Sequence, residues 1–205
     1  MWWRDLDALD GSIKYTAKDP DIHVDPSAWI APSAHLDASK GRIVIGARTR
    51  ICEGAYIEGP AAIGDDCMIG NMAMIRGPVH INNKVRIGFA TEIKSAIIHD
   101  RVTIGPQCFV ADSKIEADAY LGAQVRTSNH RLDKKSVTVI HDGKAIDTGR
   151  EKLGCLIGAR SALGIQVIIL PGRIVAPDSI FAPRITIEKN LPTGRYRHAQ
   201  QIEAF

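Results

Sequence analysis

The most constraining feature of this chain is an aliphatic residue that returns at every sixth position. Isoleucine keeps this interval without a break from Ile45 to Ile93. The residue four positions after each isoleucine is small or aliphatic, as at Ala55, Cys67 and Val79. A helix repeats about every 3.6 residues and a strand about every 2, so neither accounts for the interval. The pattern is typical of a parallel β-helix, in which each hexapeptide forms one flat side of a coil.

The repeat extends beyond this stretch in both directions. Aliphatic residues keep step from Val24 onward and, after an interruption, again as far as Ile187. We therefore predict an all-β chain with one coil over residues 24–187, a cap formed by residues 1–23 and a C-terminal tail over residues 188–205. A cap is expected because the open end of a β-helix exposes strand edges.

Residues 127–153 leave the repeat and predict an arm that projects from the coil. Two short apolar runs, residues 137–140 and 145–146, flank an Asp142-Gly143 pair. Such runs on either side of an Asp-Gly turn indicate a β-hairpin. A long excursion from a compact domain that has its own turn residues favours a functional role.

Composition narrows the classes of partner. Of the 205 residues 45% are hydrophobic and only 5% aromatic, which suits a thin core of stacked isoleucine and valine. The 26 basic and 23 acidic residues are interleaved, so no concentrated basic face is present and we expect no nucleic-acid partner. No apolar run of about 18 residues occurs, and charge appears at once after the first residues. We therefore expect no membrane span, no signal peptide and a cytoplasmic location.

Several short motifs resemble one family of enzymes over roughly residues 57–192. They include Asp112-Ser113 and the segment 168–172, and the specific ones are the Asn129-x-Arg131-x-Asp133-x-Lys135 stretch and Lys152-Leu153-Gly154. Together they resemble the C-terminal coil of archaeal-type bifunctional sugar-1-phosphate nucleotidylyltransferase/amino-sugar N-acetyltransferases, which belong to the left-handed β-helix hexapeptide transferases. The resemblance implies a left-handed coil, a homotrimer, acetyl-CoA as co-substrate and a sugar or sugar nucleotide as acceptor. Those enzymes also carry an N-terminal nucleotidyltransferase domain, for which we expect no room in this chain. The word nucleotidyltransferase would therefore describe the ancestry of this protein and not its activity.

The chain departs from this family at two positions. The family places a histidine that acts as general base, and a tyrosine three residues later, before the Asp-Ser pair. Counted without gaps from Asp112, these positions hold Pro106 and Phe109, neither of which can accept a proton. We therefore keep a second hypothesis, a trimeric protein that binds sugar nucleotides or CoA, or acts as a scaffold, and has lost its base.

Acetyl transfer to an amine needs a base for the proton and donors for the oxyanion, and the seven histidines are the natural pool for the base. The candidate catalytic residues are Asn129, His130, His99 and His80; the candidate substrate contacts are Lys135, Arg131 and Lys152; and the candidate cofactor contacts are Gly164, Arg173 and Lys189. His80 and His99 should lie one turn apart, either in a groove or as two unrelated surface histidines. Lys135 is either an anion clamp or an ordinary surface charge.

Arg173 occupies a repeat position that is small or aliphatic elsewhere, so it either reaches solvent from a widened turn or has a specific role. Metal chemistry is not expected. A γ-type carbonic anhydrase shares such a coil but needs a close pair of histidine ligands, and no His-x4-His pair occurs. The four cysteines show no zinc-type pairs and are interpreted as free thiols of a reducing compartment, with Cys67 and Cys108 at buried repeat positions.

Overall fold

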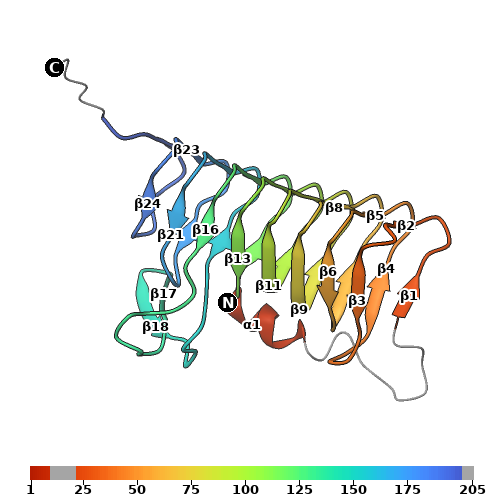
Figure 1. Cartoon of the computed structure of the whole chain (residues 1–205). Helices are drawn as coiled ribbons and strands as arrows, with labels where there is room; N and C mark the ends of the chain where they lie inside the picture. Colours follow the sequence, from red (N-terminus) through yellow and green to blue (C-terminus); the bar gives the residue numbers. More distant parts are fainter. Residues whose placement is uncertain (10–21, 200–205) are drawn as a thin grey trace.

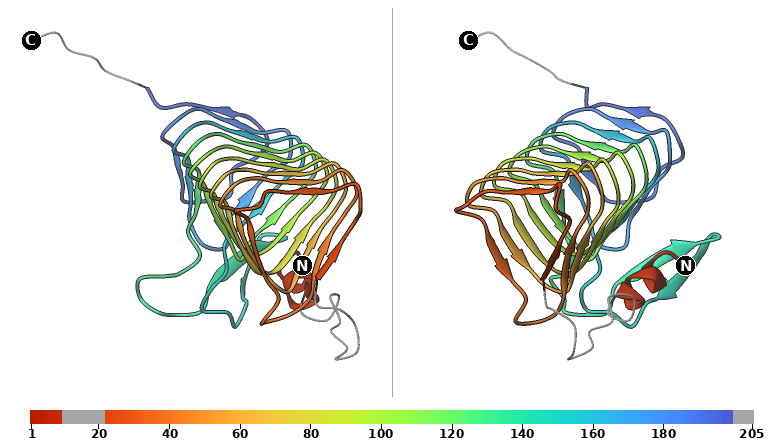
Figure 2. Two further views of the ribbon diagram at one scale, coloured as in Figure 1. Left: turned by 45° about the vertical axis from the view of Figure 1, so that its right-hand side comes forward. Right: turned by 90° about the vertical axis from the view of Figure 1, so that its right-hand side faces the viewer.

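The computed structural model describes residues 1–9 and 22–199 and forms the predicted left-handed parallel β-helix (Figure 1). Successive coils stack in parallel register, and Ile51, Ile69 and Ile87 lie directly above one another on one face. Each isoleucine of the stack is almost completely shielded from solvent. The six-residue interval therefore arises because each flat side of the coil contributes one large inward side chain. Seen closer to its axis, the coil has three flat faces (Figure 2).

The strands fall into three faces, and two long strands turn a corner and belong to both the first and the second. The first face comprises β1 (Ile22–Val24), β4 (Ile43–Ile45), β7 (Ala61–Ile63), β14 (Lys114–Ile115), β19 (Leu156–Ile157) and β22 (Ile174–Val175). The second comprises β3 (His35–Asp37), β6 (Tyr56–Glu58), β13 (Phe109–Ala111), β16 (Arg126–Thr127), β21 (Ile168–Ile169) and β24 (Thr186–Ile187). The shared strands are β9 (Met74–Ile81) and β11 (Glu92–Ile98). The third comprises β2 (Trp29–Ile30), β5 (Arg50–Ile51), β8 (Met68–Ile69), β10 (Arg86–Ile87), β12 (Thr103–Ile104), β15 (Tyr120–Leu121), β20 (Ala162–Leu163), β23 (Ile180–Phe181) and β25 (Arg195–Tyr196).

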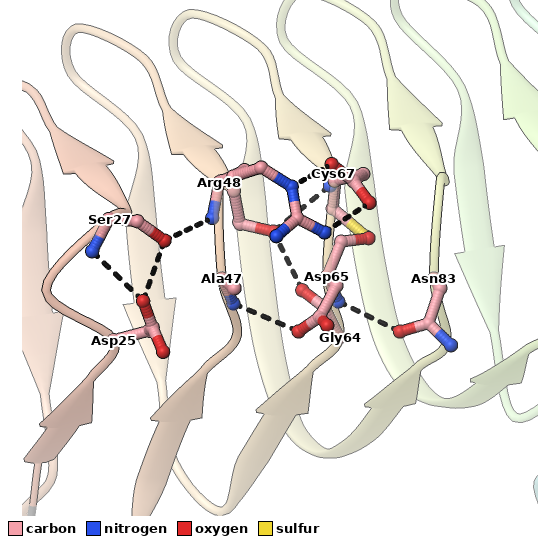
Figure 3. Close-up of polar contacts among 10 residues, drawn as sticks. Asp25, Ser27, Ala47, Arg48, Gly64, Asp65, Cys67 and Asn83 are labelled. Carbon is pink, nitrogen blue, oxygen red and sulfur yellow. Dashed lines mark hydrogen bonds and ion pairs between the residues drawn. The ribbon is translucent and has the colours of Figure 1, made fainter.

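The corners between faces are held by ladders of polar side chains. At one corner the carboxylate of Asp65 accepts the backbone N–H of Ala47, and the side-chain oxygen of Asn83 accepts the N–H of Asp65 (Figure 3). Arg48 makes a bidentate ion pair with Asp66 on the next coil. The bonds accepted by Asp65 and Asn83 satisfy backbone donors that the strand ladders leave unpaired at the turns, and the ion pair links neighbouring coils.

All four cysteines are free and buried, and the predicted burial of Cys67 and Cys108 is confirmed. Burial raises the pKa of the Cys155 thiol to about 12 and also raises the pKa of Cys67 and Cys108. These thiols act as small apolar groups of the core and not as nucleophiles.

The predicted arm is present as an antiparallel hairpin of β17 (Thr138–His141) and β18 (Lys144–Asp147). Its turn residues Asp142 and Gly143 both have positive φ, of 49° and 73°, which is the geometry that an Asp-Gly pair favours. The prediction of a hairpin at this place is confirmed.

The N-terminal segment does not cover the open end of the coil, which corrects the expectation for residues 1–9. Helix α1 (Trp3–Asp7) lies beside the arm (Figure 2), and its side chains form a second apolar cluster with the arm. That cluster contains Trp2, Trp3, Leu6, Leu9, Val137, Val139 and Leu153. The reason is that the apolar residues of the arm would otherwise be exposed to solvent, and α1 buries them. The remaining part of the expected cap, residues 10–21, lies outside the described residues.

The C-terminal segment continues the coil instead of leaving it as a separate tail. Strand β25 pairs in parallel with β23, and the ring of Tyr196 stacks on that of Phe181 with centroids 4.8 Å apart. This aromatic pair covers the last coil. Residues 200–205 of the expected tail lie outside the described part of the chain.

Candidate functional site

The family-like motifs meet at the root of the arm. The side-chain amide of Asn129 donates a 2.5 Å hydrogen bond to the carboxylate of Asp112. The N–H of Leu153 donates to the carbonyl of Asn129 at 2.9 Å, and the N–H of Gly154 donates to the carbonyl of Asp112 at 2.8 Å. Three segments that are far apart in sequence are thereby fastened together where the chain leaves and re-enters the coil.

This junction is tightly packed and fully buried around Ser113. The Ser113 hydroxyl donates to the carbonyl of Ala111 at 2.6 Å and accepts the N–H of Cys155 at 3.0 Å. A Cβ at Gly154 would overlap the hydroxyl of Ser113 and the carbonyl of Ala111, so glycine is required for this close approach. Lys94 adds a longer contact to the carboxylate of Asp112 at 3.9 Å. The junction therefore has a structural role that fixes the start of the arm.

A pocket of about 540 Å³ opens above this junction, and we call it the arm-root pocket. Its walls come from the end of β16, the first arm residues and the turn after β21. The lining residues are Ser128, His130, Arg131, Leu132, Asp133, Leu170, Pro171 and Arg173. The wall is apolar on the Leu132, Leu170 and Pro171 side and polar elsewhere. Such a mixture suits a small polar ligand with an apolar face.

The charges of the arm-root pocket are predominantly positive. Arg131 pairs with Asp133 through two hydrogen bonds of 2.8 and 2.6 Å, which hold the pKa of Asp133 well below its ordinary value. Arg173 is half-buried, and its Nε donates to the carbonyl of Pro171 at 3.1 Å. Burial lowers the pKa of Arg173, and the nearby charge of Arg131 lowers it further. An arginine remains charged under these conditions, so the pocket favours an anionic ligand.

The structure brings several of the predicted site residues together. His130, Arg131 and Arg173 line the arm-root pocket, and Asn129 lies in the chain between the lining residues Ser128 and His130 without lining the pocket itself. Lys152 forms an isolated backbone bridge with His130 across the arm. The backbone N–H of Lys135 donates to Asp133 at 3.3 Å, although Lys135 itself does not line the pocket.

The histidine pair lies elsewhere, on the first face. Ile81 and Ile98 pair directly, so His80 and His99 lie on neighbouring turns, although His80 lies opposite Ile97 and His99 is offset along the strand. Neither lines the arm-root pocket. His99 is half-buried with its Nε2 unpartnered, and burial, followed by the charge of Lys114, lowers its pKa.

Gly164 and Lys189 are also separate from the arm-root pocket. Gly164 follows β20 on the third face, where a Cβ would lie 2.7 Å from the backbone nitrogen of Pro183 on the next coil. The close approach of the two coils therefore accounts for a glycine at position 164 without a role in binding a cofactor. Lys189 is exposed two residues after β24.

The two positions that depart from the family pattern lie on or beside the second face. Phe109 lines a second groove of about 600 Å³ together with Glu92 and Arg126, while Pro106 is exposed at the adjoining corner. Glu92 accepts a hydrogen bond from Arg76 at 2.7 Å. Glu92 and Arg126 are the register partners of Phe109 on the two neighbouring coils, so a carboxylate and a guanidinium group belong to the same groove as the aromatic ring.

Sequence reasoning missed Ser128, Leu132 and the Leu170-Pro171 wall as parts of one pocket. The register between β16 and β21 pairs Thr127 with Ile169, and this puts Ser128 beside Leu170. The two paired strands are separated in sequence by the whole arm, so the six-residue repeat alone did not reveal their register. Within the described residues, no three His, Cys, Asp or Glu side chains converge as metal ligands. The same residues include no helix with the length and hydropathy of a bilayer span.

Comparison with known proteins gives a consistent result. Residues 42–77 match the family model described as bacterial transferase hexapeptide (six repeats). The chain is 53% identical over 194 residues to the uncharacterized acetyltransferase YaiX of Escherichia coli O6:K15:H31, covering 95% of this chain and 82% of that protein. It is 34% identical over 157 residues to a bifunctional sugar-1-phosphate nucleotidylyltransferase/acetyltransferase of Sulfurisphaera tokodaii, covering 77% of this chain and 39% of that protein. The solved structure of Francisella novicida UDP-N-acetylglucosamine acyltransferase covers 85% of this chain and 64% of its own at 17% identity, with a TM-score of 0.47.

Proposed function

Because the chain belongs to the hexapeptide-repeat acetyltransferases that include YaiX, we propose that it transfers an acetyl group from acetyl-CoA to an amino group of a sugar or sugar nucleotide. The class of acceptor is supported by the sequence similarity to the bifunctional enzyme, whose name combines sugar-phosphate and acetyltransferase activities. The observation that carries the proposal is the arm-root pocket, which joins the family-like motifs to an available histidine.

In the proposed reaction His130 is the general base. It is exposed in the pocket, and its imidazole makes no hydrogen bond within the described residues. Neutral imidazole accepts a proton near neutral pH, which suits this role. As the acceptor amine attacks the thioester carbonyl, a C–N bond forms and His130 takes the proton. The C–S bond then breaks, and the CoA thiolate leaves with that proton.

The remaining pocket residues would position the reactants. Arg131 and Arg173 offer guanidinium groups to anionic parts of a ligand, and Lys135 and Lys152 add charge at the edge of the arm. Asn129 is a positioning residue, since its amide is engaged by Asp112. Lys189 and Gly164 stay candidates for contacts to CoA farther along the coil.

We also propose that the working form is a homotrimer. Large apolar side chains are exposed where the third face turns into the second: Met68, Met72, Met74, Phe89, Ile165 and Ile168. A row of this kind favours burial against another copy. Sedimentation equilibrium at the mass of one 22.3 kDa chain would contradict a trimer. The four free cysteines support a reducing compartment such as the cytoplasm as its location.

Thiol release from acetyl-CoA tests the transferase directly. The protein is incubated with acetyl-CoA and a panel of amino sugars and amino-sugar nucleotides, and free CoA is measured with a thiol reagent. Acceptor-dependent release is expected for at least one member of the panel. CoA binding without release for any acceptor would favour the second candidate, a binding protein, which Pro106 and Phe109 support because neither can accept a proton.

A further inference from the structure

Arg173 departs from the repeat because its turn is fastened to the arm. Gly172 has a φ of 74°, and its N–H donates to the carbonyl of Gly154 at 2.6 Å. A Cβ at Gly172 would overlap the carbonyl of Thr138 in the arm. The side chain of Arg173 is half-buried and lines the arm-root pocket instead of entering the core.

The guanidinium of Arg173 has unused donors. Its Nε is engaged by the carbonyl of Pro171, which fixes the direction of the planar group. The two terminal nitrogens make neither a hydrogen bond nor an ion pair with residues 1–9 or 22–199. A half-buried charge without a counter-ion is unfavourable, and a ligand that supplies one removes this cost.

The groups around Arg173 do not supply a negative charge that would neutralise its guanidinium. The carboxylate of Asp133 is occupied by Arg131 through two hydrogen bonds, so it does not neutralise Arg173. The hydroxyl of Ser128 and the imidazole of His130 line the same pocket and also have no partner among the described residues. Donors therefore converge on this space from β16, the arm and the turn after β21.

We propose that Arg173, together with Ser128 and the N–H of the neutral His130 imidazole, binds a phosphoryl group in the arm-root pocket, while the other ring nitrogen of His130 stays the proton acceptor of the proposed reaction. A planar carboxylate would be satisfied by the fork of one arginine, whereas a phosphoryl group has three oxygens and can use donors from three directions. The assignment of this group to a reactant rests on the proposed function. It is carried either by the acceptor, as a sugar phosphate or nucleotide, or by CoA.

Binding of inorganic phosphate tests the site without turnover. Titration calorimetry compares the wild type with Arg173→Ala and Arg173→Lys, and with Arg160→Ala as the control. Arg160 is an exposed corner arginine that pairs with Asp178 on the next coil. Arg173→Ala should weaken phosphate binding about tenfold or more, and Arg173→Lys should weaken it less, because it keeps the charge but not the fork. Absence of saturable binding to the wild type at millimolar phosphate, or equal affinity in folded Arg173→Ala, overturns the proposal.

Steady-state kinetics then identify the source of the phosphoryl group. If the acceptor carries it, Arg173→Ala raises KM for a phosphorylated amino sugar about tenfold and leaves KM for the unphosphorylated sugar unchanged. If CoA carries it, the variant raises KM for acetyl-CoA instead. An active wild type whose two KM values are both unaffected by the substitution overturns the site. Phosphate binding without any acetyl transfer would instead refute the proposed function and leave the anion site standing.

Discussion

The side-chain amide of Asn129 donates a 2.5 Å hydrogen bond to the buried carboxylate of Asp112, 17 positions earlier in the chain. Asp112 directly follows the strand β13, and its φ of 49° lies at the corner where the chain turns from the second face to β14 on the first face. Asn129 is the residue at which the chain leaves the coil for the arm. The contact therefore fixes the direction in which the arm departs and, with it, the wall of the arm-root pocket.

Loss of this amide should destabilise the protein. Asn129→Ala leaves the carboxylate of Asp112 without a principal donor, and we expect the free energy of unfolding to fall by about 1–3 kcal/mol. Asn71→Ala is the matched control, because the amide of Asn71 donates to Glu53 at 2.8 Å on the exposed surface. Urea unfolding of the two variants should show a clearly larger loss for Asn129→Ala. Equal losses would show that the junction contributes no more than a surface contact.

A methyl group at Gly154 should prevent the arm root from closing. The added Cβ would overlap the hydroxyl of Ser113 and the carbonyl of Ala111, and we expect a loss of about 3 kcal/mol or more. Gly149→Ala serves as the comparison. Nothing lies within 4 Å of a Cβ there, but its φ of 68° adds backbone strain worth about 1–2 kcal/mol. Denaturant midpoints should rank Gly154→Ala below Gly149→Ala, and the reverse order would contradict the packing described.

His99 should make stability depend on pH. Its pKa is lowered in the folded state by burial and by Lys114, so the unfolded chain binds the proton more tightly. The stabilising contribution is present above the unfolded pKa of about 6.5 and is lost as the pH falls through the lower folded value. His99→Asn should therefore lose less stability than the wild type between neutral and mildly acidic pH. His198→Asn, in the exposed tail, should follow the wild type; identical pH profiles for all three proteins would exclude this role for His99.

Helix α1 should hold the arm in place. Trp3 is buried at 4% exposure in the cluster with Val137 and Val139, and Asp5 pairs with Lys114 at 2.7 Å. Trp3→Ala should release the helix and speed amide hydrogen exchange in residues 137–150, while the coil keeps its protection. Trp29→Ala, which removes a ring that is 40% exposed, should leave exchange in the arm unchanged. Unaltered exchange in Trp3→Ala would mean that the arm keeps its position without the helix.

The coil and the arm were predictable because each depends on a local pattern. The six-residue interval indicates one large inward side chain on each face of the coil. The Asp142-Gly143 pair indicates a tight hairpin turn, because both residues readily adopt the positive φ that such a turn requires. The position of α1 was not predictable from such patterns. Its apolar residues indicate that they cover some surface of the protein. Whether that surface is the open end of the coil or the arm depends on contacts between residues distant in sequence, such as the rings of Trp3 and His141.

The site was predictable only in part, for a related reason. The motif containing Asn129 and Arg131 pointed to the arm root, and His130 and Arg173 were identified individually. Their convergence in one pocket depends on the pairing of β16 with β21 across the arm, where Thr127 lies opposite Ile169. His80 and His99 lie on neighbouring turns as expected, but His80 lies opposite Ile97 and not opposite His99, and neither histidine lines the pocket.

The most direct test of acetyl transfer at the arm root is the initial rate of CoA release from acetyl-CoA with a saturating amino-sugar acceptor. The rate is measured for the wild type, His130→Ala and His80→Ala, with unfolding curves to verify that all three are folded. We expect His130→Ala to lower the rate roughly 100-fold or more, as removal of a general base does, and His80→Ala to remain close to the wild type. A His130→Ala protein that retains the wild-type rate, or a loss confined to His80→Ala, would contradict the account.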